Sequence, residues 1–330
     1  MQYVAIVVSL GVTVLALTVF TDAVVRMVRV IRLGQPDGSR RNDPGARTAT
    51  LVREFLGHNR MLKRPVVAVA HWFVMIGFGA LVFTLITAYG QLFDAEYALP
   101  LIGHWIPFEW FTEAIAWLTL AGIVVLTVIR QRSHPRRQGR RSRFFGSTFW
   151  QAYYVEFTIT AIALCILVLR GLEYALIGDR MHFPLTWFVG EFFSGMSTAD
   201  LEQTVYVVAA VKIVVSWAFF TVIAWNLTMG VAWHRGLAFF NIWFKREADG
   251  STALGAAKPL TVQGEPVDFE KIDDLDEDAV MGVGRVEDFS WKGFLDFSTC
   301  TECGRCQSQC PAWNTEKPLS PKLLITQLRD

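Results

Sequence analysis

The stretch VAVAHWFVMIGFGALVF, residues 67–83, is apolar at almost every position and carries one histidine, His71, near its start. It lies within a longer segment, residues 65–92, that contains no aspartate, glutamate, lysine or arginine. About 20 helical residues are needed to cross the ~30 Å hydrocarbon core of a bilayer. Only helices and closed barrels satisfy their backbone groups in lipid, so the stretch predicts a membrane-spanning helix in an all-α membrane protein.

Five segments in all are long and apolar enough to span a bilayer. The composition agrees, because 52% of the residues are hydrophobic, only 18% are charged and the mean hydropathy is +0.34. The predicted helices cover residues 4–20, 65–92, 108–129, 153–177 and 205–244, the last by extension of the apolar run 205–233 through GLAFFNIWF. No basic residue precedes the first helix, so we expect it to be retained rather than cleaved as a signal peptide. Residues 1–245 are thus predicted to form a five-helix transmembrane bundle.

Charge in the loops predicts the orientation of this bundle. Residues 22–64 hold ten basic residues and residues 130–143 hold seven arginines, whereas residues 93–107 have none and residues 178–204 have only Arg180. Basic loops stay in the cytoplasm. We therefore expect a multi-pass protein of the plasma (inner) membrane with its N-terminus outside and its C-terminus inside. Contact with lipid headgroups accounts for the basic loops, and no nucleic-acid partner is expected.

The C-terminal part carries the run CTECGRCQSQCP, residues 300–311, with the spacing C-x2-C-x2-C-x3-C-P. In ferredoxin-type modules the first three cysteines of such a run ligate one [4Fe–4S] cluster, and the cysteine before proline ligates a second. Cys300, Cys303 and Cys306 are therefore predicted to hold one cluster, and Cys310 a second. Zinc sites use separated C-x2-C pairs or added histidines, and disulfides are rare in the cytoplasm. Cys165 lies in an apolar run and is expected to be a buried hydrophobe.

An acidic segment joins the bundle to the cysteines. Residues 247–290 hold twelve acidic and three basic side chains, so residues 246–290 are predicted to be a solvated, largely irregular linker, with an acidic docking surface as the alternative. Residues 291–330 are predicted to begin a cytoplasmic α-helical ferredoxin-type domain. We expect the remaining cluster ligands in a continuation of the chain. The sequence has no glycine-rich phosphate loop in a βαβ context, so no flavin is expected in this segment.

Two histidines are placed to hold a b-type haem. His71 lies about 9 Å into its predicted helix, and His234 lies near the inner end of the fifth. These helices run in opposite directions, so both imidazoles are expected on the cytoplasmic side as axial ligands of one haem b. Each could instead be an interior histidine bonded to a neighbouring helix, but ionisable groups at membrane depth are costly and usually functional. The other histidines are expected in loops or at the interface: His58, His104, His134 and His182.

Reduction of a quinone would also need ionisable groups at membrane depth, because it consumes protons. Arg170 and Glu173 could equally pair with each other at i,i+3, and Lys212 and Glu113 could extend their charged groups to the outer interface. The candidates are Glu113, Glu156, Arg170, Glu173 and Lys212.

The segments around His71 and His234 (WHRGLAFFNIWF), together with the cysteine run and the residues after it, carry a family resemblance. The chain resembles the front part of heterodisulfide-reductase-like membrane iron–sulfur oxidoreductases, and most closely the actinobacterial electron-transfer-flavoprotein dehydrogenases. Its bundle resembles the haem-bearing gamma subunit of respiratory nitrate reductase. That subunit has two histidines on each of the corresponding helices and holds two haems. Residues 205–233 have no histidine, so one haem is expected here.

The resemblance implies a quinone-linked oxidoreductase. Electrons would pass from reduced electron-transfer flavoprotein, supplied by fatty-acid β-oxidation, through iron–sulfur clusters and haem b to menaquinone. A redox sensor or a noncatalytic membrane anchor is one alternative. Another is a quinone-linked dehydrogenase or heterodisulfide-reductase-like enzyme for a different donor. No catalytic residue is identified from the sequence.

Overall fold

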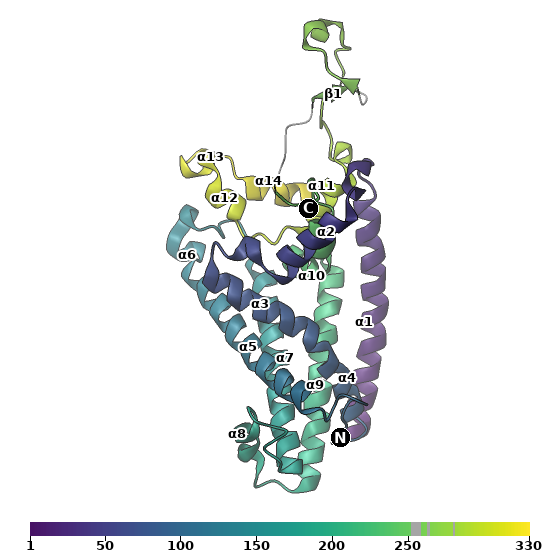
Figure 1. Cartoon of the computed structure of the whole chain (residues 1–330), viewed down its shortest axis with the longest axis vertical. Coiled ribbons are helices and arrows are strands. Elements are labelled where there is room, and N and C mark those ends of the chain that lie inside the picture. The colour runs from purple at the N-terminus through teal and green to yellow at the C-terminus, as the bar shows by residue number, and fades with distance from the viewer. Residues whose placement is uncertain (252–258, 263–264, 280) are drawn as a thin grey trace. The chain divides into compact units, whose positions relative to one another are not determined.

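The computed structural model describes residues 1–251, 259–262, 265–279 and 281–330. The chain divides into two compact units. One comprises Met1–Ala23 and Met61–Asn226, and the other comprises Val24–Arg60 and Leu227–Asp330. Helices dominate both units (Figure 1). In the described ranges the strands are β1 (Thr261–Val262) and β2 (Glu265–Pro266), which pair in antiparallel fashion.

The first unit is a bundle of long helices. They are α1 (Gln2–Ile31, whose last turns belong to the second unit), α3 (Pro65–Ala80), α4 (Val82–Gln91), α5 (Ile106–Arg132), α7 (Phe149–Ile177) and α9 (Thr198–Trp225). Short turns connect them: α6 (Pro135–Gln138), η4 (Gly139–Arg141), α8 (Trp187–Gly190) and η5 (Glu191–Phe193). Helix α5 packs against α3 and α7, and α9 packs against α7 and α4.

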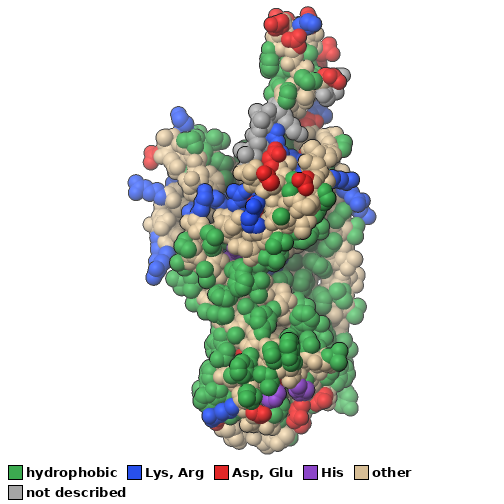
Figure 2. Space-filling model, viewed as in Figure 1, with side chains coloured by type: hydrophobic (Ala, Val, Ile, Leu, Met, Phe, Trp, Pro, Cys, Tyr) green, Lys and Arg blue, Asp and Glu red, His purple; other side chains and the backbone are tan. Residues whose placement is uncertain are grey.

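The predicted class, an all-helical membrane protein, agrees with these helices. By length and composition, the described residues contain four helices able to cross a bilayer: α1, α5 with its continuation to Arg141, α7 and α9. The bent pair α3 and α4 raises this to five if it is one span. Figure 2 shows apolar side chains covering much of the visible face of this bundle, as contact with lipid requires. Five spans and their orientation stay predictions.

Residues 65–92, expected as one helix, are two helices bent by 42° at Leu81. The backbone of Leu81 has φ −77° and ψ −2°, outside the ideal α-helical values. Gly77 and Gly79 precede the bend, and glycines are a common cause of sharp kinks. The hydroxyl of Thr84 donates to the Leu81 carbonyl at 2.6 Å, and the Lys212 ammonium donates to the Thr84 carbonyl at 2.6 Å. The carbonyls at the bend and just after it therefore have polar partners.

Glycines also set how closely α3 and α5 approach. A Cβ on Gly122 would lie 2.7 Å from the carbonyl oxygen of Ala70, and a Cβ on Gly77 would lie 1.9 Å from the Thr119 hydroxyl. Small residues let helix backbones come into close contact in lipid, where packing rather than the hydrophobic effect holds helices together. Helix α5 can therefore lie directly on the helix that carries His71.

The segment expected as one helix over residues 205–244 is also divided. Helix α9 ends at Trp225, and a separate helix, α10 (Gly230–Trp243), begins five residues later. Asn226 has φ −125° and ψ 76° and Met229 has φ −75° and ψ 65°, so neither continues the helix. The side-chain amide of Asn226 donates to the Val222 carbonyl at 2.7 Å. His234 therefore belongs to α10, not to the long apolar helix before it.

The second unit combines the segment after α1 with the C-terminal part of the chain. Its elements are η1 (Gly38–Arg41), α2 (Pro44–Leu51), η2 (Val52–Leu56, a π-helical turn), η3 (Asn59–Met61), α10, η6 (Phe269–Asp274), η7 (Val286–Asp288), α11 (Trp291–Thr299), α12 (Arg305–Gln309), α13 (Pro311–Asn314) and α14 (Pro321–Arg329). Helix α11 packs against α10 and α14, as Figure 1 allows the reader to follow.

Arginine and glutamate side chains fasten the 43–60 segment to the end of α10. Arg47 is 1% exposed and donates to the carbonyls of Trp243 at 2.8 Å and Lys245 at 2.7 Å. The Glu54 carboxylate forms ion pairs with Lys245 and with Arg60. The hydrogen bonds from Arg47 satisfy backbone carbonyls at the end of α10, which a helix end leaves without partners. Basic residues counted as topology signals thus also hold the second unit together.

Candidate functional site

The cysteine run lies in the second unit between short helices. Helix α11 ends at Thr299, directly before Cys300, α12 begins after Gly304, and α13 begins after Cys310 with Pro311 in its first turn. Glu302 and Gly304 have φ of 54° and 67°, which turns the chain sharply between the cysteines. Cys300 and Cys310 are half-buried, whereas Cys303 and Cys306 are exposed.

Buried charges surround this loop. The Lys322 side chain is completely buried, and Arg329 pairs with Glu302 at 2.9 Å with both side chains less than a tenth exposed. Burial lowers the pKa of Lys322, against the opposing charges of Glu302 and the cysteines. Burial also raises the pKa of the Cys300 thiol, although its backbone hydrogen bond and the Arg329 charge oppose this. Two cations therefore stand close to the thiols.

The four cysteines offer the thiolate ligands that an iron–sulfur cluster needs, at the spacing of ferredoxin-type modules. Within the described residues, no three histidine, cysteine, aspartate or glutamate side chains converge closely enough to hold one ion. A cubane keeps its ligand sulfurs farther apart than one ion does, and its thiolate-ligated core is negatively charged. Cys300, Cys303 and Cys306 lie near enough to one another and to Lys322 to interact electrostatically. Their assignment as cluster ligands stays a prediction, as does Cys310.

Helix α10 packs directly on the cysteine loop. A Cβ on Gly230 would lie 2.0 Å from the carbonyl oxygen of Cys300, so only glycine fits there without movement of the backbone. His234 follows four residues later, and its Nδ1 lies 3.2 Å from the Gly230 carbonyl oxygen. This places His234 about 6 Å along the helix from the contact.

The two predicted haem ligands lie in different units. His71 is half-buried in α3 of the first unit, and His234 is half-buried in α10 of the second. Their pairing stays a prediction. His58 is buried in the second unit, where burial lowers its pKa despite a contact of 2.9 Å between its Nδ1 and the Phe55 carbonyl. His134 stacks on Phe149 with ring centroids 4.2 Å apart.

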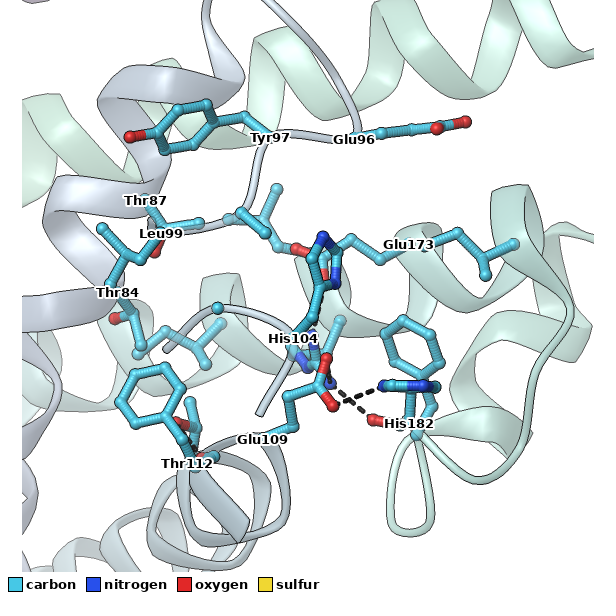
Figure 3. A pocket seen from close by; sticks show the side chains of 18 of the residues that line it. Thr84, Thr87, Glu96, Tyr97, Leu99, His104, Glu109, Thr112, Glu173 and His182 are labelled. Carbon is cyan, nitrogen blue, oxygen red and sulfur yellow. Dashed lines mark hydrogen bonds and ion pairs between the residues drawn. The ribbon is translucent and has the colours of Figure 1, made fainter. Parts of the chain in front are cut away.

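A cavity of about 210 Å³ lies within the first unit, and ionisable and apolar residues line it (Figure 3). Its walls come from α4, α5, α7 and α9 and from the loops after α4 and α7. Phe108, Ile166, Leu169 and Phe183 provide apolar surface. Its charged lining residues are Glu96, Glu109, Arg170, Glu173, Asp179 and Lys212.

Arg170 is the centre of the charge network at this pocket. Its guanidinium contacts Glu113 at 3.2 Å and Glu173 at 2.5 Å, and it donates to the His182 carbonyl at 2.6 Å. It also stacks over the Phe183 ring at 4.2 Å from the centroid. The predicted i,i+3 pair of Arg170 and Glu173 is therefore formed. The Arg170 guanidinium needs these partners because an unpaired buried charge is energetically very costly.

Glu113 is completely buried behind the pocket and has further partners. Its carboxylate accepts hydrogen bonds from the Leu185 amide at 2.8 Å and the Thr186 hydroxyl at 2.6 Å. These bonds attach the loop after α7 to helix α5. Glu113 thus organises the wall of the cavity and does not line it.

Lys212 and Glu156 differ in their surroundings. Lys212 is 1% exposed and lines the pocket, where its ammonium donates to the Thr84 carbonyl. Glu156 pairs with Arg130 at 2.6 Å near the other end of the bundle. Of the five quinone candidates, Arg170, Glu173 and Lys212 line one cavity, Glu113 supports it, and Glu156 does not take part.

Sequence reasoning overlooked Glu109 and His182. The Nδ1 of His182 lies 2.6 Å from a carboxylate oxygen of Glu109, and both residues line the cavity. Figure 3 shows the Glu109 carboxylate pointing toward the His182 ring. His182 was expected to be a solvated loop residue, but the loop after α7 returns to cover the bundle. The sequence feature that could have identified this site is Glu109 itself, a glutamate in the first turn of an apolar helix.

The amino-acid sequence is similar to those of two oxidoreductases and of a probable membrane-anchored ferredoxin. The chain is 25% identical over 280 residues to the EtfAB:quinone oxidoreductase of Syntrophomonas wolfei, an overlap that covers 81% of this chain and 35% of that protein. A probable membrane-anchored ferredoxin of Chromohalobacter salexigens is 32% identical over 116 residues, which is 32% of this chain and 16% of that protein.

Local identity is also shared with the probable iron-sulfur-binding oxidoreductase FadF of Bacillus subtilis. It is 51% over 63 residues, or 19% of this chain and 9% of that protein. No protein-family model and no solved structure matches the chain. The chain spans about a third or less of the length of each of these relatives. It is therefore related to membrane iron–sulfur oxidoreductases and, over most of its own length, to an EtfAB:quinone oxidoreductase.

Proposed function

We propose that the chain is the membrane part of an oxidoreductase that passes electrons from a cytoplasmic donor to menaquinone. The donor is reduced electron-transfer flavoprotein formed in fatty-acid β-oxidation. The relationship to the EtfAB:quinone oxidoreductase supports the donor and acceptor classes. Bound clusters and a b haem would supply the one-electron steps between donor and acceptor.

The observation that carries the proposal is the contact between α10 and the cysteine loop. Gly230 meets the Cys300 carbonyl, and His234 lies one helical turn farther along the same helix. Electron transfer needs its centres held at short, fixed separations. A rigid helix that carries a predicted haem ligand at one turn from a predicted cluster ligand supports such a transfer.

Each residue has a definite role under this proposal. Cys300, Cys303 and Cys306 would hold one [4Fe–4S] cluster and Cys310 would ligate a second. His71 and His234 would be the axial ligands of haem b. Buried side chains of α11 and α13 would keep water from the cluster: Phe294, Phe297 and Trp313.

One observation favours a second candidate, a membrane anchor or redox sensor without quinone turnover. A relative bears the name probable membrane-anchored ferredoxin, and its match covers 32% of this chain. Such a protein would still hold a cluster and would not reduce quinone.

Optical spectra test the haem assignment. We expect the purified full-length protein to show a b-type haem that is lost in His71→Ala and in His234→Ala, because an axial ligand is removed in each. His134→Ala is the matched control and should keep the spectrum, since His134 stacks on Phe149 in a loop. Haem retained at full occupancy in both ligand variants would refute the assignment.

Delivery of electrons to the protein distinguishes a quinone-reducing enzyme from a redox sensor that does not reduce quinone. Reduced electron-transfer flavoprotein is mixed anaerobically with the full-length protein and menaquinone, and quinol is followed by its absorbance. We expect two electrons and two protons to be taken up per quinol formed. Reduction of the clusters without quinol formation would support the sensor.

A further inference from the structure

We propose that the cavity lined by Glu109, Arg170, His182 and Lys212 binds the quinone head group, and that His182 and Glu109 deliver protons to it. This inference rests on the proposed function for the source of electrons and adds the location and the proton path. All of the residues concerned belong to the first unit.

The size of the cavity suits a head group and not a complete isoprenoid quinone. Its volume is about 210 Å³, and an apolar cavity of about 150 Å³ is known to hold benzene. A ring system of one or two fused rings therefore fits, while an isoprenoid tail would extend into lipid. Phe108, Ile166, Leu169 and Phe183 provide the apolar surface that such rings need.

The charge of the lining selects a neutral ligand. Four acidic residues line the cavity, Glu96, Glu109, Glu173 and Asp179, against the two cations Arg170 and Lys212. A phosphate or carboxylate would meet excess negative charge there. A quinone is uncharged, and its carbonyl oxygens need only hydrogen-bond donors.

Lys212 is the donor best placed for a carbonyl oxygen. Its ammonium is buried, lines the cavity and donates one hydrogen bond, to the Thr84 carbonyl, in the described part of the chain. A lysine ammonium has three donors. Arg170, by contrast, is committed to Glu113, Glu173 and the His182 carbonyl.

His182 and Glu109 connect this cavity to solvent. The His182 side chain is 28% exposed, whereas that of Glu109 is 5% exposed. The His182 Nε2 faces Asp179 at 3.9 Å, and Arg170 lies 4.0 Å from Glu109. These contacts hold the His182 ring at the surface and the Glu109 carboxyl group inside.

The proton transfer balances over one turnover. An incoming proton adds at His182 Nε2 while the Nδ1 proton passes to Glu109, and the imidazole returns to its first tautomer afterwards. Protonated Glu109 gives its proton to a quinone oxygen. Two electrons, supplied through the clusters and haem b of the proposed function, and two such protons convert both carbonyls to hydroxyls and release quinol.

Binding of menadione, a tailless naphthoquinone, to the full-length protein tests the location without any electron donor. Ala98→Trp inserts an indole at the lining and should abolish binding. Leu101→Trp, on the same loop at a fully exposed position outside the lining, should leave it unchanged. Lys212→Met should weaken binding about tenfold, as expected for loss of a charged hydrogen-bond donor.

Turnover tests the proton path. His182→Ala should slow quinol formation at saturating quinone by about 100-fold, and added imidazole should restore part of the rate. The His182 backbone carbonyl that anchors Arg170 is kept in this variant. A slow rate that imidazole does not restore overturns the relay.

Failure of the site and failure of the proposed function give different results. If the wild type forms quinol and Ala98→Trp binds menadione as the wild type does, the location is wrong and the function stands. If the wild type binds menadione in the cavity but forms no quinol from reduced flavoprotein, the function is wrong and the site stands.

Discussion

The buried position of Lys322 beside the cysteines has a consequence for the redox chemistry of the predicted cluster. Lys322 has no exposed surface, and its neighbours are the Glu302 carboxylate and the thiols of Cys300, Cys303 and Cys306. Burying an ammonium is costly unless anions are near. A thiolate-ligated cluster would supply such anions. Lys322 is thus expected to stabilise the more negative, reduced form of the cluster.

Replacing Lys322 with methionine should lower the midpoint potential of the cluster at Cys300. A buried unit charge nearby contributes on the order of 1–2 kcal/mol at protein dielectric constants, which corresponds to roughly 50–100 mV for one electron. Redox titration followed by electron paramagnetic resonance measures this. Lys317→Met, at an exposed position of the same module, should leave the potential unchanged. A shift to higher potential in Lys322→Met would contradict the role.

At the residue scale, the sequence predicted the kinds of side chain involved but not all of their partners. The Arg170–Glu173 pair followed from i,i+3 spacing, and its formation is confirmed. Glu109 and His182 are 73 residues apart and meet only because the loop after α7 returns to the bundle. No local pattern encodes that contact.

Helix α10 is the element on which the proposed electron path depends. It is separated from α9 by Asn226–Met229, it begins at Gly230 against the Cys300 carbonyl, and it carries His234. Apolar residues run through both helices, so hydropathy alone predicted one helix. The interruption depends on backbone conformations that apolarity does not reveal.

Gly230→Ala should displace the cysteine loop, because the added Cβ would lie 2.0 Å from the Cys300 carbonyl oxygen. Overpacking of this kind costs about 1–3 kcal/mol. We expect less iron and labile sulfide per chain after anaerobic reconstitution, and earlier thermal unfolding.

Gly236→Ala is the matched control for this substitution. It lies on the same helix, and a Cβ there has no atom within 4 Å among those the structure describes. Iron content should then equal that of the wild type. Equal iron loss in both variants would mean that helix propensity, not the contact, is responsible.

At the scale of the whole molecule, the distribution of charge predicts which loops face the cytoplasm. Residues 22–64 and 130–143 are basic, and residues 93–107 and 178–204 are nearly free of lysine and arginine. The structure adds that the pocket is lined by residues 96–99, 103–104, 179 and 182–183, all from the loops of predicted outer location.

Impermeant maleimide labelling of intact spheroplasts checks this topology. We expect Phe192→Cys, at a position 85% exposed in the loop before α9, to be labelled from outside. Arg136→Cys, exposed in the arginine-rich loop, should react only after the membrane is opened. The unmodified protein, which has only its native cysteines, is the reference for the extent of labelling. Labelling of Arg136→Cys in intact spheroplasts would reverse the predicted orientation.

The sequence by itself determined the helical membrane class, the cysteine spacing and the candidate ionisable residues, because hydropathy, ligand spacing and charge are local properties of the chain. Only the tertiary structure decided the bend at Leu81, the break before α10, and the gathering of Arg170, Glu173 and Lys212 around one cavity with Glu109 and His182. These features arise from contacts between distant segments, where glycines let backbones meet and buried charges must find partners.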